Sequence, residues 1–529
     1  MTRGIAYSVC LLALVGCGPE HYKRDADERA YAAIDARWEE GFGSRANYRI
    51  SDVSPSPGDI QVDAAIPASG VLTLPRAVAI ATAHNREYQT QKELLYTTAL
   101  DLRLVQHDFE TFLFGGGRAF YSGNGTDEAI AAEANVGFNR LLATGTQIAA
   151  EVATAWTKVL LGSRDSGLSS LLTATVSHPL LRGSDPDIVM ERLTQADRNL
   201  LYQIRTFNRY RKTFVVSVIT QYYQALELRD LTDNAKAHYE GLKGLYDQTM
   251  VLTSAGRIPL LEVDRLRQEI LQTRDRVILA EKEYERFLDE FKITLGLATN
   301  VEFELDGGVF QALVDAGIPE SKVVVADAVD AALRRRLDMA NSADAVLDAQ
   351  RAVHVAADSL RADLRIGGNL DMNTDGDASG TVGGIVDLPL DRVAEQTTYR
   401  KALITLDQRR RDYDLAADTV RLEVRQAHRK LQETAQRHRV LTEGRQLAMH
   451  RLGRTTELLK YGRVSSRRAL AAQQDLYVAE NEATDALIDH ATAVLDFYRD
   501  TGVLQVRPDG MWSHEAGSLP LTSDAVVTP

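Results

Sequence analysis

The residues best suited to chemistry in this chain are two cysteines, eleven histidines and several glycine clusters. The histidines are scattered, and none forms a His-Glu-x-x-His or Cys/His arrangement that would hold a metal. His428 and His438, for example, lie ten residues apart, which does not suit a tight metal pair on one helix. The glycines at 115–117 and at 376 lack the Lys-Ser/Thr of a phosphate loop, so we interpret them as turns, and no Gly-x-Ser-x-Gly nucleophile elbow is visible. We therefore expect no catalysis, no cofactor and no metal site.

The remaining reactive group is a thiol near the N-terminus. A positive start and a mostly apolar stretch at 5–15, too short to span a bilayer, predict a secretory signal peptide over 1–17. The stretch ends in Leu-Val-Gly-Cys at 14–17, which resembles the lipobox of bacterial lipoproteins. That resemblance implies cleavage before Cys17 and lipidation of its thiol, and Gly18 in place of Asp favours sorting to the outer membrane. The alternative is an ordinary signal peptide with a cysteine there by chance.

Composition excludes several other classes. There are 61 Lys and Arg against 74 Asp and Glu, a net charge of −13, and an acidic chain with interspersed charges is a poor partner for nucleic acid. The other cysteine, Cys10, lies in the leader, so no disulfide framework is expected in the mature chain. No apolar run long enough to cross a bilayer as a helix follows the leader. If the chain crosses a membrane, it must do so as a closed β-barrel.

The chain contains an internal duplication. Residues 256–259 (Gly-Arg-Ile-Pro) and 462–465 (Gly-Arg-Val-Ser) each precede a long amphipathic stretch that closes on Gly296 or Gly502. The offset within both glycine pairs is 206 (462 − 256 and 502 − 296), so the two stretches align without a gap. Correspondences in the same order lie upstream, where 77–79 matches 328–330 and 175–180 matches 385–390. We assign a first repeat to 72–300 and a second to 325–505, each reading helix, strand, turn, strand, long helix, glycine turn, long helix.

Long helices dominate both repeats. An opening helix is predicted over about 74–107, and arms of roughly 70 residues, or about 100 Å, run to about 254 and 461. The first return arm has an apolar seam with heptad-like spacing, which predicts coiled-coil-like packing. Its residues are Val263, Leu266, Ile270, Val277, Ala280, Tyr284, Phe287 and Phe291, and their smaller counterparts are Ala469, Ala472, Leu476, Ala479, Ala483 and Ala486. An ordinary four-helix bundle would show the same periodicity.

Alternating strands argue for a barrel instead. Leu364, Ile366, Leu370 and Met372 alternate with polar residues, and a turn-rich loop and a second alternating run at 381–388 follow. Similar runs occupy 147–156 and 172–177. Such strands match the transmembrane barrel pattern, although a half-buried sheet in a soluble domain would also alternate. Four strands cannot close a barrel around a channel, so oligomerisation would be required.

An ordered set of motifs resembles the outer-membrane efflux proteins of the TolC type. Residues 72–85 look like their opening motif, 176–183 like their strand-to-helix junction, 256–263 like their inter-helix tip, and 293–297 like their closing segment. The resemblance covers about 72–505. It implies a mainly α-helical protein with a β-barrel portion. In that arrangement, a homotrimer forms a twelve-stranded outer-membrane β-barrel and a periplasmic α-helical coiled-coil tunnel. It further implies a passive conduit of a tripartite efflux or type I secretion system, docked by a periplasmic adaptor (membrane fusion protein) and driven by an inner-membrane pump.

Two departures from that family stand out. The first repeat has 102 residues between Ala77 and Pro179 against 61 between Ala328 and Pro389, and the extra residues near 115–167 could not be placed. Six residues past the second tip glycine, where the family often carries an acid at the tunnel constriction, this chain has Arg468. The predicted tip and gate residues are Gly256, Glu262, Asp264, Gly462, Arg463, Arg467 and Arg468.

The flanks are read as an N-terminal periplasmic segment and linker over 18–71 and a C-terminal tail over 506–529. Residues 22–41 are charged and helical in pattern, whereas the rest of both flanks is rich in Pro, Gly or Ser. One alternative function stays open, a periplasmic coiled-coil lipoprotein with a structural or adaptor role and no pore.

Overall fold

The computed structural model describes residues 18–50, 70–123, 127–161, 166–318, 323–388, 390–507 and 512–514. The predicted signal peptide with Cys17, most of the predicted linker, Pro389 and most of the tail lie outside these residues. The chain divides into two compact units, which we call the sheet unit and the hairpin unit. The sheet unit comprises Met1–Trp38, Leu94–Ile204 and Asn341–Asp414, and the hairpin unit comprises Glu39–Glu93, Arg205–Ala340 and Leu415–Pro529.

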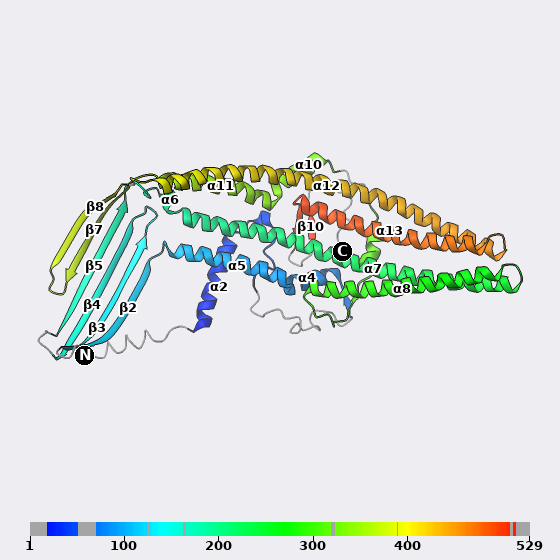
Figure 1. Ribbon diagram of the computed structural model, residues 1–529, viewed down its shortest axis with the longest axis horizontal. Coiled ribbons are helices and arrows are strands. Elements are labelled where there is room, and N and C mark those ends of the chain that lie inside the picture. Colours follow the sequence, from blue (N-terminus) through cyan, green and yellow to red (C-terminus); the bar gives the residue numbers. More distant parts are fainter. Residues whose placement is uncertain are drawn as a thin grey trace. The chain divides into compact units, whose positions relative to one another are not determined.

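The sheet unit is built on one six-stranded antiparallel sheet with the order β2-β3-β4-β5-β7-β8 (Figure 1). Its strands are β2 (Phe112–Gly123), β3 (Glu128–Leu141), β4 (Gln147–Leu161), β5 (Gly167–Pro179), β7 (Asp363–Asn373) and β8 (Ala378–Asp387). β5 belongs to the first repeat and β7 to the second, yet they pair from Leu171↔Asn373 to Pro179↔Arg365. This pairing joins the two repeats in one sheet.

The four alternating runs expected from sequence are confirmed as β4, β5, β7 and β8, but the strand count was too low. The residues that could not be placed form most of an additional hairpin, β2–β3, which pairs over twelve residue pairs. Residues 115–117 lie in the middle of β2, so the interpretation of these glycines as a turn was wrong. Three adjacent glycines have no side chains and therefore erase the alternation that marks a strand. Gly376, with φ +86°, does occupy a turn, as expected.

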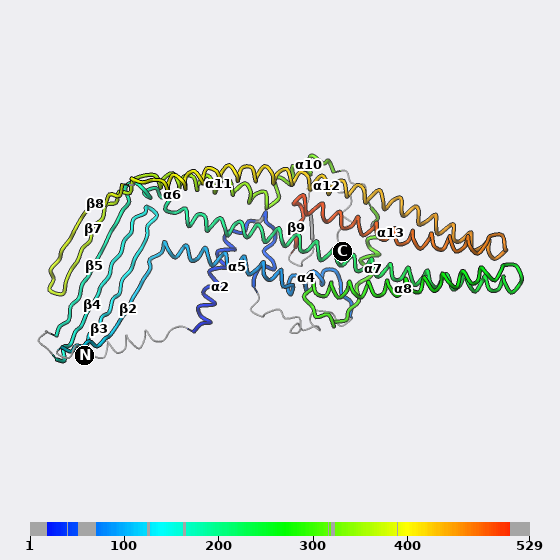
Figure 2. The backbone as a smooth tube through the Cα atoms, in the orientation of Figure 1, coloured from blue at the N-terminus to red at the C-terminus, as the bar shows by residue number. Residues whose placement is uncertain are grey.

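The four long helices occupy the parts of the sequence where they were predicted (Figure 2). They are α7 (Glu191–Ser254), α8 (Leu260–Leu295), α12 (Val393–Lys460) and α13 (Ser466–Asp500). Shorter helices are α2 (Pro19–Arg37), α4 (Leu74–His84), α5 (Arg86–His107), α6 (Pro186–Val189), α9 (Gly308–Ala316), α10 (Val325–Arg335) and α11 (Leu337–Asp358). Small strand pairs join β1 (Val71–Leu72) to β6 (Glu304–Leu305) and β9 (Leu504–Val506) to β10 (Trp512–His514). Among the described residues, no helix is both long and apolar enough to span a membrane.

The opening helix expected as one element is broken at the same place in both repeats. In the first repeat the break falls at Asn85, whose side-chain carbonyl accepts a hydrogen bond from the backbone N–H of Tyr88 at 2.9 Å. The side-chain amide of Asn85 donates to the carbonyl of Thr294 at 2.9 Å. In the second repeat the break falls at Arg336, between α10 and α11. A side chain that caps the new helix and reaches a distant carbonyl fixes this break, and helical periodicity alone does not reveal it.

The glycine turns of the two helical hairpins have the same geometry. Gly256 has φ +71°, and the N–H of Arg257 donates to the carbonyl of Leu252 at 2.9 Å. Gly462 has φ +66°, and the N–H of Arg463 donates to the carbonyl of Leu458 at 3.0 Å. A left-handed residue after the helix and this long-range bond define a Schellman cap, which glycine adopts without steric penalty.

Candidate functional site

The sheet has one apolar face and one largely polar face, and the largely polar face also carries Phe112, Phe114 and Phe120 of β2, Leu171 of β5 and Ile385 of β8. Residues directly opposite in an antiparallel register share a face, so the faces can be followed across all six strands. The apolar face carries Leu113 and Tyr121 of β2, Val136 and Phe138 of β3, Val152 and Trp156 of β4, Leu172 and Val176 of β5, Ile366 and Leu370 of β7, and Val382 and Val386 of β8. Its charged residues within the strands, Glu128, Arg140 and Lys158, lie toward strand ends. An apolar band of about ten residues with charges at its margins has the dimensions of a bilayer core.

The apolar face of the sheet unit is open to solvent rather than covered by a core. Apolar side chains stand in solvent, with Val136 61% and Val382 85% exposed. Polar neighbours such as Asn135, Glu151 and Asp371 are only half-exposed. A soluble sheet buries its apolar face against a core, whereas a lipid-facing sheet presents that face outward.

The polar face is held by side-chain contacts between strands. Asn135 donates to a carboxylate oxygen of Glu151 at 2.9 Å, and Thr173 donates to Asp371 at 2.9 Å. Arg118 of β2 pairs with Glu133 of β3 at 2.6 Å. The polar face and its side-chain contacts between strands therefore extend from β7 of the second repeat to the additional hairpin, β2–β3.

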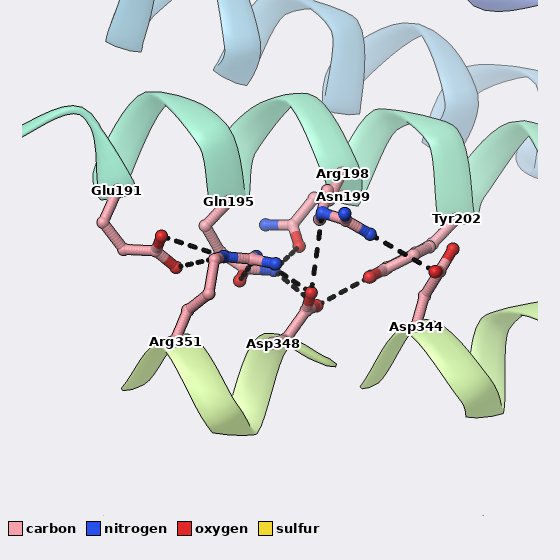
Figure 3. Close-up of polar contacts among 8 residues, drawn as sticks. All are labelled: Glu191, Gln195, Arg198, Asn199, Tyr202, Asp344, Asp348 and Arg351. Carbon is pink, nitrogen blue, oxygen red and sulfur yellow. Dashed lines mark hydrogen bonds and ion pairs between the residues drawn. The ribbon is translucent and has the colours of Figure 1, made fainter. Parts of the chain in front are cut away.

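The helices of the sheet unit are joined by a polar seam between α7 and α11 (Figure 3). Asp348 of α11 accepts hydrogen bonds from the Tyr202 hydroxyl at 2.7 Å and from Gln195 at 3.1 Å. Arg351 pairs with Glu191 and with Asp348, each at 2.9 Å. Burial, followed by the hydrogen bond to Asp348, raises the pKa of Tyr202 to about 12, so the hydroxyl remains a donor. These contacts hold α7 of the first repeat against α11 of the second repeat, and the charged side chains of the seam are paired with one another.

The two predicted tips contact each other within the hairpin unit. Leu245, Leu266, Leu459 and Ala469, one from each of the four long helices, form a buried cluster. Next to it, the hydroxyl of Ser466, the first residue of α13, donates to a carboxylate oxygen of Glu262 at 3.0 Å. Glu262 also pairs with Arg265 of its own helix at 3.2 Å. Glu262 therefore links the two hairpins of one chain, a role that spacing did not reveal.

The other predicted tip residues stay at the surface. Arg463, Arg467 and Arg468 are exposed on the α12–α13 tip, and Asp264 is exposed on the α7–α8 tip. Glu262 and Arg468 are each the third residue of their helix, which agrees with the equivalence expected from the duplication. The α12–α13 tip is strongly basic, because Lys460 and the three arginines lie within nine residues that contain no acid.

An acidic group lies between α7 and α13 in the hairpin unit. Burial, followed by the charges of Asp485, Asp489 and Asp230, raises the pKa of Glu227 to about 7. Arg437 of α12 neutralises part of this charge by pairing with Asp485 at 2.7 Å and Asp489 at 2.9 Å. Within the described ranges, no group of three His, Cys, Asp or Glu side chains is arranged to hold a metal ion.

Solved outer-membrane channels share this architecture. The Campylobacter jejuni CmeC outer membrane channel superposes with a TM-score of 0.60 at 13% identity, over 88% of this chain and 91% of that one. CusC, whose structures concern transmembrane channel formation, gives 0.59 at 14% identity over 81% and 92%. The open-state MtrE channel of Neisseria gonorrhoeae gives 0.57 at 13% identity over 81% and 88%. The sequence matches no family profile and no curated protein.

The chain therefore has the fold of these outer-membrane channels, and the expected combination of long helical hairpins with an antiparallel sheet is confirmed. Sequence reasoning placed the long helices, the tips and four of the strands. It missed the β2–β3 hairpin, the Glu262–Ser466 contact and the polar seam. Alternation at 130–138 (Ile-Ala-Ala-Glu-Ala-Asn-Val-Gly-Phe) was the one available sign of β3.

Proposed function

We propose that this protein is the outer-membrane channel of a tripartite efflux or type I secretion system. It is a passive conduit: an inner-membrane pump supplies the energy, a periplasmic adaptor docks on the hairpin tips, and three copies form the channel. The protein extends from the outer membrane into the periplasm. The substrate is chosen by the pump.

The two-faced sheet carries this proposal. A coiled-coil protein that stays in the periplasm does not need this six-stranded sheet, which exposes an apolar face to solvent and has hydrogen bonds across its polar face. They suit a wall with lipid on one side and water on the other. The periplasmic coiled-coil lipoprotein without a pore is accordingly the weaker candidate.

Fractionation combined with bilayer recording tests the proposal. The full chain is expected in outer-membrane fractions as a trimer that dissociates on heating, and the purified trimer is expected to give stepwise conductance in planar bilayers. A monomer released by carbonate, with no conductance, would favour the structural lipoprotein instead.

Lipid attachment at Cys17 is a separate part of the proposal. The thiol is the group that lipoprotein processing modifies, and the leader ends in a lipobox-like sequence. Cys17→Ser is expected to abolish acyl labelling and to leave the leader uncleaved. Labelling that persists in the variant would contradict the assignment without affecting the channel.

A further inference from the structure

We propose that three copies of this chain close an eighteen-stranded barrel in which β2 of each copy pairs with β8 of the next. This inference rests on the proposed trimeric channel and adds the interface that builds it. The occupant of each sheet edge is a second copy of this chain. The twelve strands implied by the family resemblance follow from four strands per chain, whereas this sheet has six, and three times six is eighteen.

The edges of the sheet require a partner in lipid. β2 and β8 are the end strands of the sheet as described, each bonded to one neighbouring strand. The outer sides of these strands present rows of backbone N–H and C=O groups, and such groups are not tolerated unpaired in hydrocarbon. β2 has 12 residues and β8 has 10, so the edges are nearly matched in length.

Strand direction permits the pairing. All five pairings in the sheet are antiparallel, so six strands place β2 and β8 in opposite directions. β8 of one copy can then lie antiparallel to β2 of the next without breaking the alternation. A hairpin adds two strands and keeps the number even, whereas one added strand would not.

The additional hairpin, β2–β3, extends the barrel wall and does not cover the barrel opening. β3 pairs with β4 over fourteen residue pairs, with one register shift between Glu128 and Ala129. Its apolar residues Ile130, Val136 and Phe138 continue the apolar face, and Glu133 and Asn135 continue the polar face. Both edges carry glycines, at 115–117 in β2 and at 383–384 in β8, which allow two backbones to approach closely.

Eighteen strands imply a wider and acidic lumen. With strands about 4.8 Å apart and tilted by about 40°, the barrel would be about 36 Å across at the backbone, against about 24 Å for twelve strands. The polar face of each chain carries two arginines, Arg118 and Arg365, and five acids, which are Glu133, Glu151, Asp363, Asp371 and Asp387. The net charge of 2 − 5 = −3 per chain gives −9 in the trimer and favours the passage of cationic or neutral bulky molecules.

Disulfide trapping in the full chain tests the edge pairing. The native cysteines, Cys10 and Cys17, both lie in the predicted leader region, so engineered thiols meet no competing thiol within the sheet. Cysteines are introduced on the apolar face in pairs, one from Gly115, Gly117 or Ala119 in β2 and one from Gly380, Val382 or Gly384 in β8. Matched control pairs replace the β2 position with Ala150, Val152 or Thr154 of β4, the edge that β8 would meet if the additional hairpin lay outside the wall.

Some β2–β8 pairs are expected to give a ladder that ends at covalent trimers on non-reducing gels, and β4–β8 pairs are expected to give none. Trimers cross-linked through β4 and β8, or ladders that stop at the dimer, would overturn the eighteen-stranded closure. Imaging the unmodified trimer down its barrel axis gives an independent measurement, since a wall only as wide as twelve strands allow would also overturn it. If the unmodified protein forms no conducting trimer at all, the proposed function itself has failed.

Discussion

The two repeats share a helical hairpin but contribute unequally to the sheet. The return helices α8 and α13 have 36 and 35 residues, and their tips have matching glycine caps. In contrast, the first repeat supplies four strands and the second supplies two. A helical hairpin packed along its length against its counterpart cannot change length without losing register. A sheet edge can accept another hairpin, because two added antiparallel strands keep the strand directions alternating and keep apolar and polar side chains on their respective faces.

The repeats also differ where their hairpins meet. By the offset between the repeats, Leu266 in the first return helix is matched by Ala472 in the second, and Val263 is matched by Ala469. At these two positions the first seam therefore has larger side chains than the second. Two substitutions test whether the seams are complementary: one removes side-chain volume from the first seam, and the other adds side-chain volume to the second.

The largest effect is expected from Leu266→Ala. Leu266 is 1% exposed in the cluster that joins all four long helices, so its truncation leaves a cavity and should destabilise the hairpins by about 2–5 kcal/mol. Ala469→Leu should overpack the same cluster by about 1–3 kcal/mol. Denaturant unfolding of the helical signal measures both. Arg267→Ala, at an exposed position of the same helix, should change little, and an equal loss there would indicate a general intolerance of α8.

A similar effect is expected from charges on the apolar face of the sheet. Leu370→Lys in β7 should impair membrane assembly by about 2–4 kcal/mol near the bilayer midplane, and Val136→Lys in β3 should match it if the additional hairpin is wall. The matched controls on the polar face are Asn369→Lys and Asn135→Lys, which should be mild. The yield of heat-dissociable trimer in outer-membrane fractions measures all four. If Val136→Lys lowers the trimer yield only slightly while Leu370→Lys lowers it strongly, the β2–β3 hairpin is not part of the barrel wall. Equal losses from substitutions on both faces would indicate a soluble sheet.

A smaller, pH-dependent effect distinguishes Glu227 from its repeat counterpart Glu433. The pKa of Glu227 is raised to about 7 by burial and by three nearby aspartates, so the folded protein retains a proton that the unfolded chain releases. This penalty is absent below the ordinary pKa of about 4.5, grows as the pH rises, and is complete above about 7. Glu227→Gln should therefore stabilise the protein at pH 8 by about 1–2 kcal/mol, after discounting for partial exposure, and by little at pH 4.

Glu433 is exposed and pairs with Lys430 at 3.6 Å, so Glu433→Gln is the matched control. Thermal unfolding at the two pH values measures the difference. A gain from Glu227→Gln that is the same at pH 4 and pH 8 would show that packing rather than ionisation is responsible.

The smallest effect concerns the tips, where one hairpin has mixed charges and the other is basic. We propose that Glu262 and Arg468 alternate around a closed trimer, with Asp264, Arg463 and Arg467 as helpers. Exposed pairs each contribute about 0–1 kcal/mol, so several must act together. Arg468→Glu should raise resting conductance by up to about fivefold and shift selectivity toward cations.

Adding Glu262→Arg to Arg468→Glu should partly restore closure, and Arg454→Glu, at an exposed position of α12 outside the named tip residues, controls for charge alone. Because Glu262 accepts the hydrogen bond of Ser466 in its own chain, Ser466→Ala separates this contact from the gate. Unchanged conductance and selectivity in Arg468→Glu would remove the gate assignment but not the channel.

The sequence by itself determined those features that depend on local periodicity. Equivalent glycine turns, heptad-like seams and alternating strands indicated the duplication, the long helices, both tips and four strands. These patterns are carried by neighbouring residues, so they can be recognised without knowing what lies across from them.

Only the tertiary structure decided which distant segments meet. β5 pairs with β7, the Tyr202 hydroxyl donates to Asp348, and Ser466 donates to Glu262, and each of these contacts joins the first repeat to the second. The additional hairpin belongs to the same group, because glycines 115–117 carry no pattern and gain their strand conformation from the backbone bonds of β3. Contacts of this kind are selected by the pairing of strands across the sheet and the packing of the long helices, and no local stretch of sequence contains them.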